Sequence, residues 1–246
     1  MCIRDSVEEV LSGRNAIVRI RYTRGGELYE ARGTNCVLAC YHRTIPHIFP
    51  TLPAKQKAAL AQSVKGPLVY TNVLLRNWHA MKNLGLRRAY CPNGLYHSIA
   101  MDFPVSLGAY QFAKSPDDPV VLHLVHVPYT RDTGLSAKDQ WRLGRRHMMA
   151  RSFADHERSI RQQLTSILEP GGFNERRDIE AITLNRWPHG YTYEYIPLWD
   201  KRSGERPHVR ARKTQGRVAI AGSDSGASAY ADAAIDQAFR AVNDLV

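Results

Sequence analysis

The chain has 246 residues, of which 43% are hydrophobic and 23% charged, and its 34 lysines and arginines outnumber its 23 aspartates and glutamates. This composition excludes intrinsic disorder and a collagen-like fold, and no apolar run reaches the roughly 20 residues that a membrane-spanning helix needs. The net charge of +11 could attract nucleic acid, an anionic cofactor or a membrane surface, and it does not choose among them. Asp5, Glu8 and Glu9 stand where the apolar stretch of a cleavable signal would lie, so we expect none; the compartment stays unknown.

The predicted strands are short runs rich in β-branched and aromatic residues. The first two flank a Gly-Gly turn and are expected to form a hairpin. The third is a continuous apolar run, which is typical of a strand buried on both faces. In chain order the predicted strands are residues 16–22, 27–31, 35–40, 67–75, 120–127, 179–187 and 217–221.

Three helices are predicted. The first covers residues 54–64 and begins after Pro53, and the second is a single long helix over residues 137–168 that ends at Glu169-Pro-Gly-Gly. The third begins at about Ala229, and residues 201–215 before it are expected to be a surface loop. The long helix has an apolar stripe made by Met149, Phe153, Ile160, Leu164 and Ile167. The last helix has one made by Ile235, Ala238, Phe239, Val242 and Leu245.

Neither the cysteines nor the histidines predict a metal site. Cys36 and Cys40 lie in an apolar run and are expected to be buried core thiols, and no Cys/His pair with zinc-site spacing accompanies them. His123 and His126 are three positions apart in a predicted strand, so they face opposite sides. Arginines cover much of the long helix, but no nucleic-acid-binding motif accompanies them, so no nucleic-acid partner is expected.

The segment from Gly216 to Ala238 is the most informative. A predicted strand runs into a loop of small residues that contains Asp224, and a helix with small residues in its first turns follows. Small residues allow a ligand to approach the backbone, and a helix N-terminus favours negative charge. Asp224 suits the hydroxyl groups of a ligand better than a phosphate. A purely structural strand–loop–helix unit remains the alternative.

This segment resembles the closing motif of the flavin amine oxidase family. The matching residues are Ala221-Gly-Ser-Asp224 and Ala229-Tyr-Ala-Asp-Ala-Ala234. The resemblance implies a set of FAD contacts in this segment: Gly222, Ser223, Asp224, Tyr230 and Ala231. It also implies that the N-terminus of the last helix faces the pyrimidine ring of the flavin, where reduction places negative charge.

A second resemblance to the same family lies in the segment that begins Asn185-Arg-Trp-Pro-His-Gly-Tyr191. In that family this segment passes beside the flavin, and its aromatic residue forms a cage for the substrate amine together with the tyrosine of the last helix. Tyr191 and Tyr230 are therefore the predicted catalytic residues, with Tyr193 as the alternative to Tyr191, and Trp187 is expected to pack near the flavin. A tyrosine-rich edge strand without a ligand is the structural alternative.

Other residues define which member of the family the chain resembles. A hairpin followed by Phe49-Pro-Thr-Leu-Pro53 keeps the family's order, and the combined motifs are most similar to the spermidine dehydrogenase-like branch. Tyr70 stands where many members have a lysine. Gly190 stands where some members have a cysteine that binds FAD covalently, so noncovalent FAD is expected.

The chain has no GxGxxG fingerprint for the FAD pyrophosphate. Residues 1–6 resemble translated sequencing adapter, so we expect a C-terminal portion whose N-terminal FAD-binding half is missing. This portion is expected to be inactive alone. The implied fold class is α/β, or α+β mixed: part of a two-domain FAD-dependent amine oxidase-type fold. Residues 1–40 would be a strand meander of the FAD-binding domain, 41–183 a mixed-sheet substrate-binding domain, and 184–246 the closing part of the incomplete, Rossmann-like FAD-binding domain.

The implied function is oxidation of an amine by hydride transfer to FAD, with a polyamine as one option. The positive charge of this portion counts against a polycationic substrate. Two alternatives remain: a related flavoprotein that acts on a non-amine substrate, and a basic nucleic-acid-binding module. The specific amine, the electron acceptor, an additional haem and the oligomeric state are not predicted.

Overall fold

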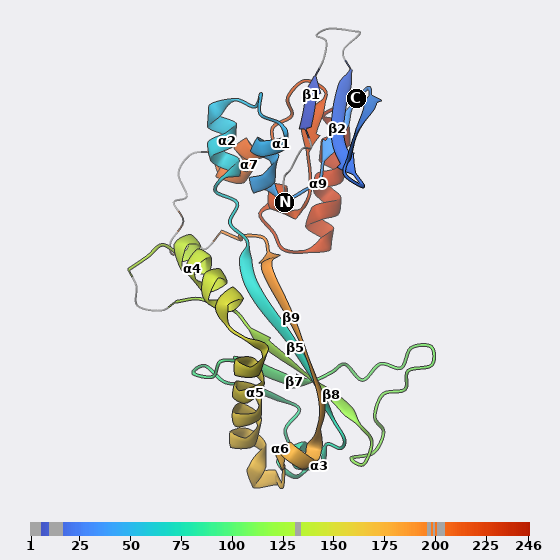
Figure 1. Cartoon of the computed structure of the whole chain (residues 1–246), viewed down its shortest axis with the longest axis vertical. Coiled ribbons are helices and arrows are strands. Elements are labelled where there is room, and N and C mark those ends of the chain that lie inside the picture. The colour runs from blue at the N-terminus through green and yellow to red at the C-terminus, as the bar shows by residue number, and fades with distance from the viewer. Residues whose placement is uncertain (1–5, 10–16, 131–133, 196–197, 199, 201–204) are drawn as a thin grey trace. The chain divides into compact units, whose positions relative to one another are not determined.

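The fold is described from a computed structural model, which covers residues 6–9, 17–130, 134–195, 198, 200 and 205–246 (Figure 1). The chain divides into two compact units. Unit 1 comprises Met1–Lys65 and Tyr191–Val246, and unit 2 comprises Gly66–Gly190. The first predicted residue of the first strand, Ala16, and the adapter-like residues 1–5 lie outside the described part of the chain.

Unit 1 contains the predicted hairpin. Strands β1 (Ser6–Glu9), β2 (Val18–Arg24) and β3 (Glu27–Gly33) form an antiparallel sheet in that order. Gly25 and Gly26 connect β2 to β3 with φ values of 61° and 88°, which only glycine adopts without strain and which a two-residue hairpin turn requires. The hairpin prediction is confirmed, and β1 is an additional strand that the sequence pattern did not indicate.

A second sheet in unit 1 pairs two distant segments. Strand β4 (Cys36–Leu38) is parallel to β10 (Val218–Ile220). All of β10 is buried, but Val37 is 41% exposed and Cys40 is exposed. The prediction that residues 35–40 are buried on both faces, with two core thiols, is therefore wrong. The described part of unit 1 covers one face of β4, and an apolar run alone does not indicate how many faces are covered.

The helices of unit 1 pack around this parallel pair. They are the short helices η1 (His42–Thr44), α1 (Ile45–Ile48), α2 (Ala54–Leu60), α7 (Pro207–Ala211) and α8 (Ser223–Gly226), and the longer α9 (Ala231–Asn243). The α7 helix corrects the surface loop predicted over residues 201–215, of which 201–204 lie outside the described residues. Ala211 is fully buried, and its carbonyl accepts a hydrogen bond from the Gln56 side chain at 3.0 Å.

The last helix presents an unexpected face to the interior. Ala241 is fully buried beside Ala219 and Ala221 of the β10 segment, because small side chains allow the helix to approach the strand closely. The larger apolar side chains of the predicted stripe point outward: Ile235, Phe239 and Val242 are 56%, 69% and 55% exposed. The helix itself was predicted correctly, but its apolar stripe is not the face that this chain buries.

Unit 2 is built on a five-stranded sheet in the order β6-β7-β8-β5-β9. The strands are β5 (Gly66–Leu75), β6 (Arg88–Tyr90), β7 (Ser98–Met101), β8 (Val120–His126) and β9 (Ile179–Tyr191), whose last residue belongs to unit 1. The pairs β6–β7, β7–β8 and β5–β8 are antiparallel. The three strands of this sheet that the sequence predicted are confirmed, and β9 is four residues longer than expected.

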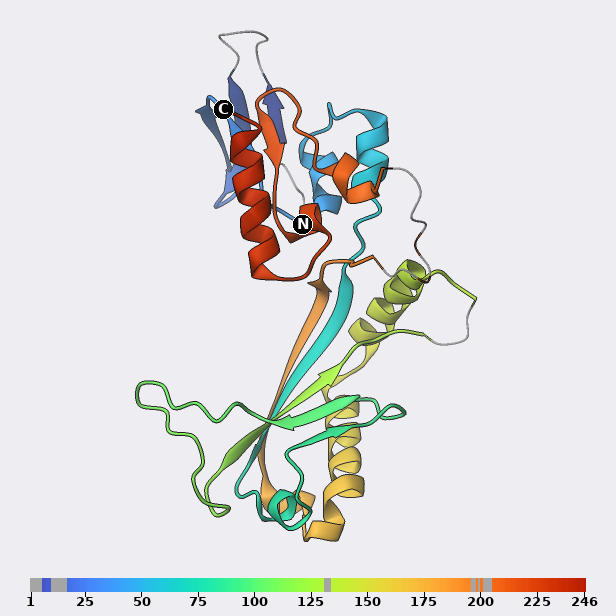
Figure 2. The same cartoon turned by 180° about the vertical axis from the view of Figure 1, so that it is seen from behind.

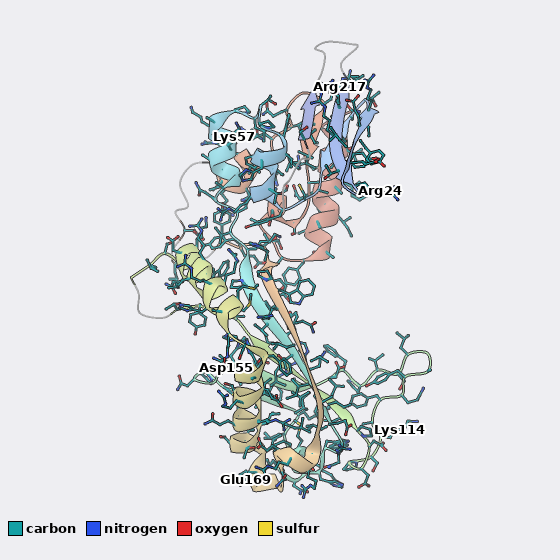
Figure 3. The ribbon with its side chains drawn as sticks, in the orientation of Figure 1. Arg24, Lys57, Lys114, Asp155, Glu169 and Arg217 are labelled. Atoms are coloured by element: carbon teal, nitrogen blue, oxygen red, sulfur yellow. The ribbon has the colours of Figure 1, made fainter. Side chains whose placement is uncertain are left out.

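Two helices replace the single predicted one over residues 137–168. Helix α4 (Ala137–Ala150) ends at Arg151, and α5 (Phe153–Leu168) begins after Ser152, whose hydroxyl accepts a hydrogen bond from the Asp155 N–H. Helix α5 lies beside the sheet (Figure 2). Its residues Ile160 and Leu164 are fully buried in the core of unit 2, whereas Met149 of α4 and Phe153 are about half exposed. The side chain of Asp155 marks the first turn of α5 in Figure 3, and Glu169 marks its end. The capping serine divides the predicted stripe into two.

The remaining helices of unit 2 are α3 (His79–Asn83), η2 (Glu169–Gly171) and α6 (Glu175–Asp178). Gly172 follows η2 with a φ of 96°, as expected for the predicted Pro-Gly-Gly stop. No helix in the described part of the chain is long and apolar enough to cross a membrane.

A polar cluster lies between the sheet of unit 2 and α5. The hydroxyl of Tyr96 lies 3.0 Å from His156 Nδ1 and accepts from Thr71 at 3.3 Å. Burial lowers the pKa of His156 to about 4, with the Arg151 guanidinium contributing, and burial lowers the pKa of His126 to about 4 as well. Both imidazoles are therefore neutral at physiological pH.

The borders of the compact units differ from the expected domain borders. Residues 41–65 pack in unit 1, and the border expected after residue 183 lies inside β9. Which unit binds the flavin and which binds the substrate stays a prediction. The division into units follows from contacts within the chain, and these contacts do not identify a ligand.

Candidate functional site

The predicted cofactor loop begins at Gly222, between β10 and α8. Its φ of 99° and ψ of 171° fall in a region that only glycine occupies readily. A Cβ at this position would have its nearest contact at the Ala39 carbonyl oxygen, 3.8 Å away. The glycine is therefore required by the backbone conformation and not by lack of space.

Asp224 lies directly after this turn and is only 5% exposed. Its Oδ2 accepts a hydrogen bond from the His42 N–H at 3.1 Å, and its Oδ1 accepts one from the Thr192 hydroxyl at 2.9 Å. The Lys65 ammonium lies 3.0 Å from Oδ1. Both carboxylate oxygens thus bind groups of unit 1, and contact between this carboxylate and a cofactor stays a prediction.

The imidazole of His42 extends this hydrogen-bond network to two serine hydroxyls. Its Nε2 lies 2.9 Å from the Ser225 hydroxyl and its Nδ1 lies 3.1 Å from the Ser63 hydroxyl. Burial lowers the pKa of His42 to about 4, although the Asp224 carboxylate opposes the shift. A neutral ring satisfies both contacts if Nε2 donates to Ser225, which in turn donates to the Ile220 carbonyl, and Nδ1 accepts from Ser63.

Thr192 connects the loop to the segment that follows β9. Its hydroxyl oxygen lies 2.8 Å from the Ser223 hydroxyl and 3.3 Å from the Lys65 ammonium. A hydroxyl has one proton and two lone pairs, so Thr192 can donate to Asp224 while it accepts from Ser223 and Lys65. All the hydrogen-bonding capacity of this buried hydroxyl is therefore used.

The two predicted cage tyrosines both belong to unit 1 and both have accessible rings. Tyr191 is 46% exposed and Tyr230 is 68% exposed. Tyr193 is 6% exposed, and its hydroxyl donates to Asp200 at 2.8 Å, while burial raises its pKa. Of the two candidates after β9, Tyr191 is thus the one whose ring a ligand could reach.

Tyr230 is also the N-terminal capping residue of α9. Within the described residues, its side chain makes no capping hydrogen bond. The preceding N–H, that of Ala229, donates to the Glu194 carboxylate at 2.8 Å. Ala231 begins the helix and is exposed.

The Thr192 hydroxyl thus joins Ser223 and Asp224 to the residue that follows Tyr191. Tyr230 and Ala231 lie at the start of α9 in the same unit. Trp187 lies on β9 in unit 2 and is 53% exposed. Four residues of the site were not predicted from the sequence: His42, Lys65, Thr192 and Glu194. No local pattern marks these residues, since His42 and Asp224, for example, are 182 positions apart.

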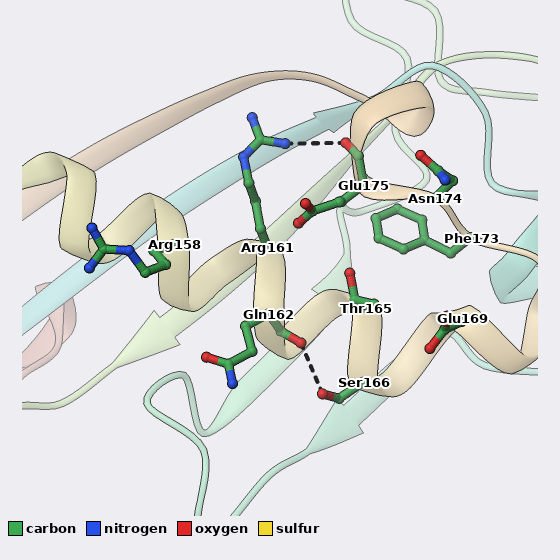
Figure 4. Close-up of a pocket in the computed structure, with 9 residues that line it drawn as sticks. All are labelled: Arg158, Arg161, Gln162, Thr165, Ser166, Glu169, Phe173, Asn174 and Glu175. Atoms are coloured by element: carbon green, nitrogen blue, oxygen red, sulfur yellow. Dashed lines mark hydrogen bonds between the residues drawn. The ribbon is translucent and has the colours of Figure 1, made fainter.

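A surface cavity of about 500 Å³ lies elsewhere, beside α5 and α6 in unit 2. Its arginines are engaged with the protein: Arg161 donates to the Glu175 carbonyl (Figure 4) and to the Glu157 carboxylate, and Arg158 pairs with Asp155. None of the predicted site residues lines this cavity. It adds nothing to the candidate site.

No protein-family model matches the chain, and no curated protein matches it. Solved structures of amine oxidases have a similar fold. Cyclohexylamine oxidase from Brevibacterium oxydans IH-35A matches 92% of this chain with a TM-score of 0.60 and 15% identity. A triple mutant of putrescine oxidase with redesigned cofactor binding matches 98% with a TM-score of 0.63 and 14% identity.

Wild-type putrescine oxidase bound to putrescine matches 92% of the chain, with a TM-score of 0.61 and 14% identity. The chain spans less than half of these structures, namely 45%, 48% and 45% of their lengths. At such identities the likeness establishes the fold, which is a mixed helix and sheet fold of the amine oxidase type over part of its length.

Proposed function

We propose that the chain is the C-terminal portion of a flavin-dependent oxidoreductase that oxidises an amine. The observation that carries the proposal is the coincidence of two independent likenesses. The fold resembles amine oxidases over almost all of the chain, and the closing-motif residues from Gly222 to Ala231 lie in one unit with two accessible tyrosines.

The residues of unit 1 fit a flavin in three respects. Gly222 presents bare backbone in a conformation that a side chain would strain, Ser223 is partly exposed, and α9 starts at an accessible turn. Gly222, Ser223 and Ala231 would hold FAD by backbone and hydroxyl contacts, and the positive end of α9 would stabilise negative charge on its ring. FAD, when bound, supplies the acceptor for the hydride.

The structure also supports noncovalent attachment. A Cβ at Gly190 would lie 3.1 Å from both the Gly66 carbonyl oxygen and the Leu68 Cβ. These distances are tighter than ordinary van der Waals contact, so a side chain here would require its neighbours on β5 to shift by a few tenths of an ångström. We therefore propose that close packing favours glycine at position 190 and that the flavin is held noncovalently.

Tyr191 and Tyr230 would orient the amine and keep it neutral. Two aromatic rings on either side of the amine give an apolar enclosure, and such an enclosure disfavours the charged ammonium form. Amine oxidation by hydride loss requires the neutral form, so the protein needs to supply orientation and desolvation more than acid–base groups. Because this portion carries a net charge of +11, we favour an amine with one charge over a polyamine.

Exposed apolar side chains on unit 1 support the proposal that a further portion of the protein packs against this unit. Parallel strands are normally covered on both faces, yet β4 exposes Val37, and α9 exposes Ile235, Phe239 and Val242. The matched structures are about twice as long as the chain. We propose that these apolar side chains pack against the N-terminal FAD-binding half, which would also bring the pyrophosphate site.

The test is amine turnover by the complete protein, loaded with FAD, with amines of different charge and with a polyene as the non-amine substrate. We expect Tyr230→Ala and Tyr191→Ala to lower kcat/KM for the preferred amine by roughly tenfold or more, because a loosely held amine loses its alignment. Tyr90→Ala is the matched control, since Tyr90 is 69% exposed and lies on β6 in unit 2. Turnover of the polyene alone, or equal activity of all three variants, would refute the proposal.

A further inference from the structure

Two side chains of one short segment bond to groups near the two proposed cage tyrosines. Thr192 lies next to Tyr191 and bonds to the Gly222–Asp224 loop, and Glu194 bonds to the residue before Tyr230. The segment follows β9 directly, and Tyr191 is the last residue of that strand. Thr192 is 5% exposed, and Glu194 is exposed. The two anchors differ in chemistry, because one is a neutral hydroxyl in a buried network and the other is a carboxylate at the surface.

The first anchor holds the backbone beside Tyr191. The Thr192 hydroxyl is bonded to Asp224 at 2.9 Å and to Ser223 at 2.8 Å. Thr192 is 5% exposed and its hydroxyl is fixed on both sides, whereas the ring of Tyr191, one residue before it, is 46% exposed. The torsional freedom of the Tyr191 backbone is thus limited by contacts that its neighbour makes with the cofactor loop.

The second anchor holds the backbone beside Tyr230. The Glu194 carboxylate accepts from the Ala229 N–H at 2.8 Å, one residue before Tyr230. A hydrogen bond from an N–H to a carboxylate is stronger than one between neutral groups, and the positive end of α9 adds to the attraction. Glu194 therefore ties the segment after β9 to the turn from which α9 starts.

We propose that Thr192 and Glu194 are positioning residues that set the separation of the Tyr191 and Tyr230 rings. This inference rests on the proposed function for the role of the rings, but the anchoring itself is independent of it. The two bonds close a loop: Tyr191 is joined to the Gly222–Asp224 turn through Thr192, and Tyr230 is joined to the same short segment through Glu194. Loss of either bond would release one ring relative to the other.

The first experiment uses the 246-residue chain without cofactor, with 3-fluorotyrosine placed at position 191 or 230 and the fluorine NMR signal recorded. We expect Glu194→Ala to shift and broaden the signal from position 230, and Thr192→Val to do so for position 191. Glu194→Gln keeps a carbonyl oxygen that can accept from Ala229, so it should retain the signal better than Glu194→Ala. Wild-type signals in both Glu194→Ala and Thr192→Val would overturn the inference.

Matched controls separate positioning from general loosening of unit 1. Glu205→Ala removes a carboxylate that pairs with Arg210 and Lys213, and Thr214→Val removes a hydroxyl that donates to Asp244 at 2.9 Å. Both bonds join residues outside the segment after β9. Both controls should leave the two fluorine signals in place, and equal shifts in the controls would overturn the inference.

The second experiment uses the complete protein with FAD. Glu194→Ala should lower kcat for the amine by about tenfold while flavin content stays unchanged, and adding Tyr230→Ala should cause no further tenfold loss, because both changes disable the same ring. Losses that multiply would overturn the inference. If the wild-type protein oxidises no amine, the proposed function fails, and the fluorine experiment still decides whether the anchors position the rings.

Discussion

Replacing Asp224 by asparagine removes the negative charge that faces the Lys65 ammonium at 3.0 Å while it keeps the size of the side chain. Removing one partner of a buried ion pair costs about 3–5 kcal/mol because the other charge is left uncompensated. The side chain of Lys65 is 14% exposed, so water reaches it in part, and we expect the lower end, about 3 kcal/mol. An amide also has one oxygen where the carboxylate has two, so a donor would face a donor at either His42 or Thr192.

The loss is expected in unit 1 alone. Hydrogen exchange measured by mass spectrometry over a urea series reports each unit separately, which global unfolding of a two-unit chain does not. Glu157→Gln is the matched control: Glu157 pairs with Arg161 on α5, and the two side chains are 35% and 30% exposed, so both regain water when the pair is broken. We expect about 1 kcal/mol there, confined to unit 2. A loss below about 1 kcal/mol for Asp224→Asn, or equal losses in the two variants, would refute the reasoning.

Three further predictions concern pH, the loop glycine and α9. The pKa values of His126 and His156 are about 4 in the folded chain against about 6.5 unfolded, so the stability of unit 2 should be complete above pH 6.5 and fall as the pH drops toward 4, by up to about 3 kcal/mol for each imidazole. Exchange midpoints in urea at pH 7.5 and pH 5 check this, with a smaller drop expected for His156→Gln; identical wild-type midpoints would contradict it. Gly222→Ala should destabilise unit 1 by about 2 kcal/mol in urea unfolding, because of its backbone conformation, whereas Gly226→Ala meets only ordinary contacts and should be near neutral. Phe239→Ser, at a side chain that is 69% exposed, should change the stability of this chain by less than about 0.5 kcal/mol, while the buried Leu164→Ala should cost about 3 kcal/mol; a large loss for Phe239→Ser would show that α9 buries this face.

The sequence predicted the positions of most helices better than it predicted which of their faces are buried. Periodicity located α5 and α9 because each has an apolar stripe, but it joined α4 to α5, since Ser152 and Asp155 fit a polar helix face as well as a capping turn. Periodicity also cannot indicate which side of a helix is covered. In α9 the buried residue is the small Ala241, and the large side chains lie outside.

In the candidate site, too, the sequence pattern predicted residues that are neighbours in the chain but not the contacts between distant residues. The loop motif identified Gly222 to Asp224 and Tyr230 because their residue types follow one another in the sequence. Lys65 and His42 approach the loop from a segment more than 150 positions away, so their roles follow from the folded chain alone. The sequence predicted Asp224 as a ligand contact, whereas its hydrogen bonds within unit 1 indicate that it first holds the loop together.

Anaerobic mixing of the FAD-loaded complete protein with a primary amine distinguishes an amine-oxidising flavoprotein from the alternatives in one step. We predict that the visible absorption of the oxidised flavin is lost as the amine is added. The loss should be slower, with unchanged flavin content, when Tyr191→Ala and Tyr230→Ala are combined. Retention of the oxidised spectrum with every amine, or loss at the same rate in the double variant, would contradict the proposed roles of the two tyrosines and of the loop between β10 and α9.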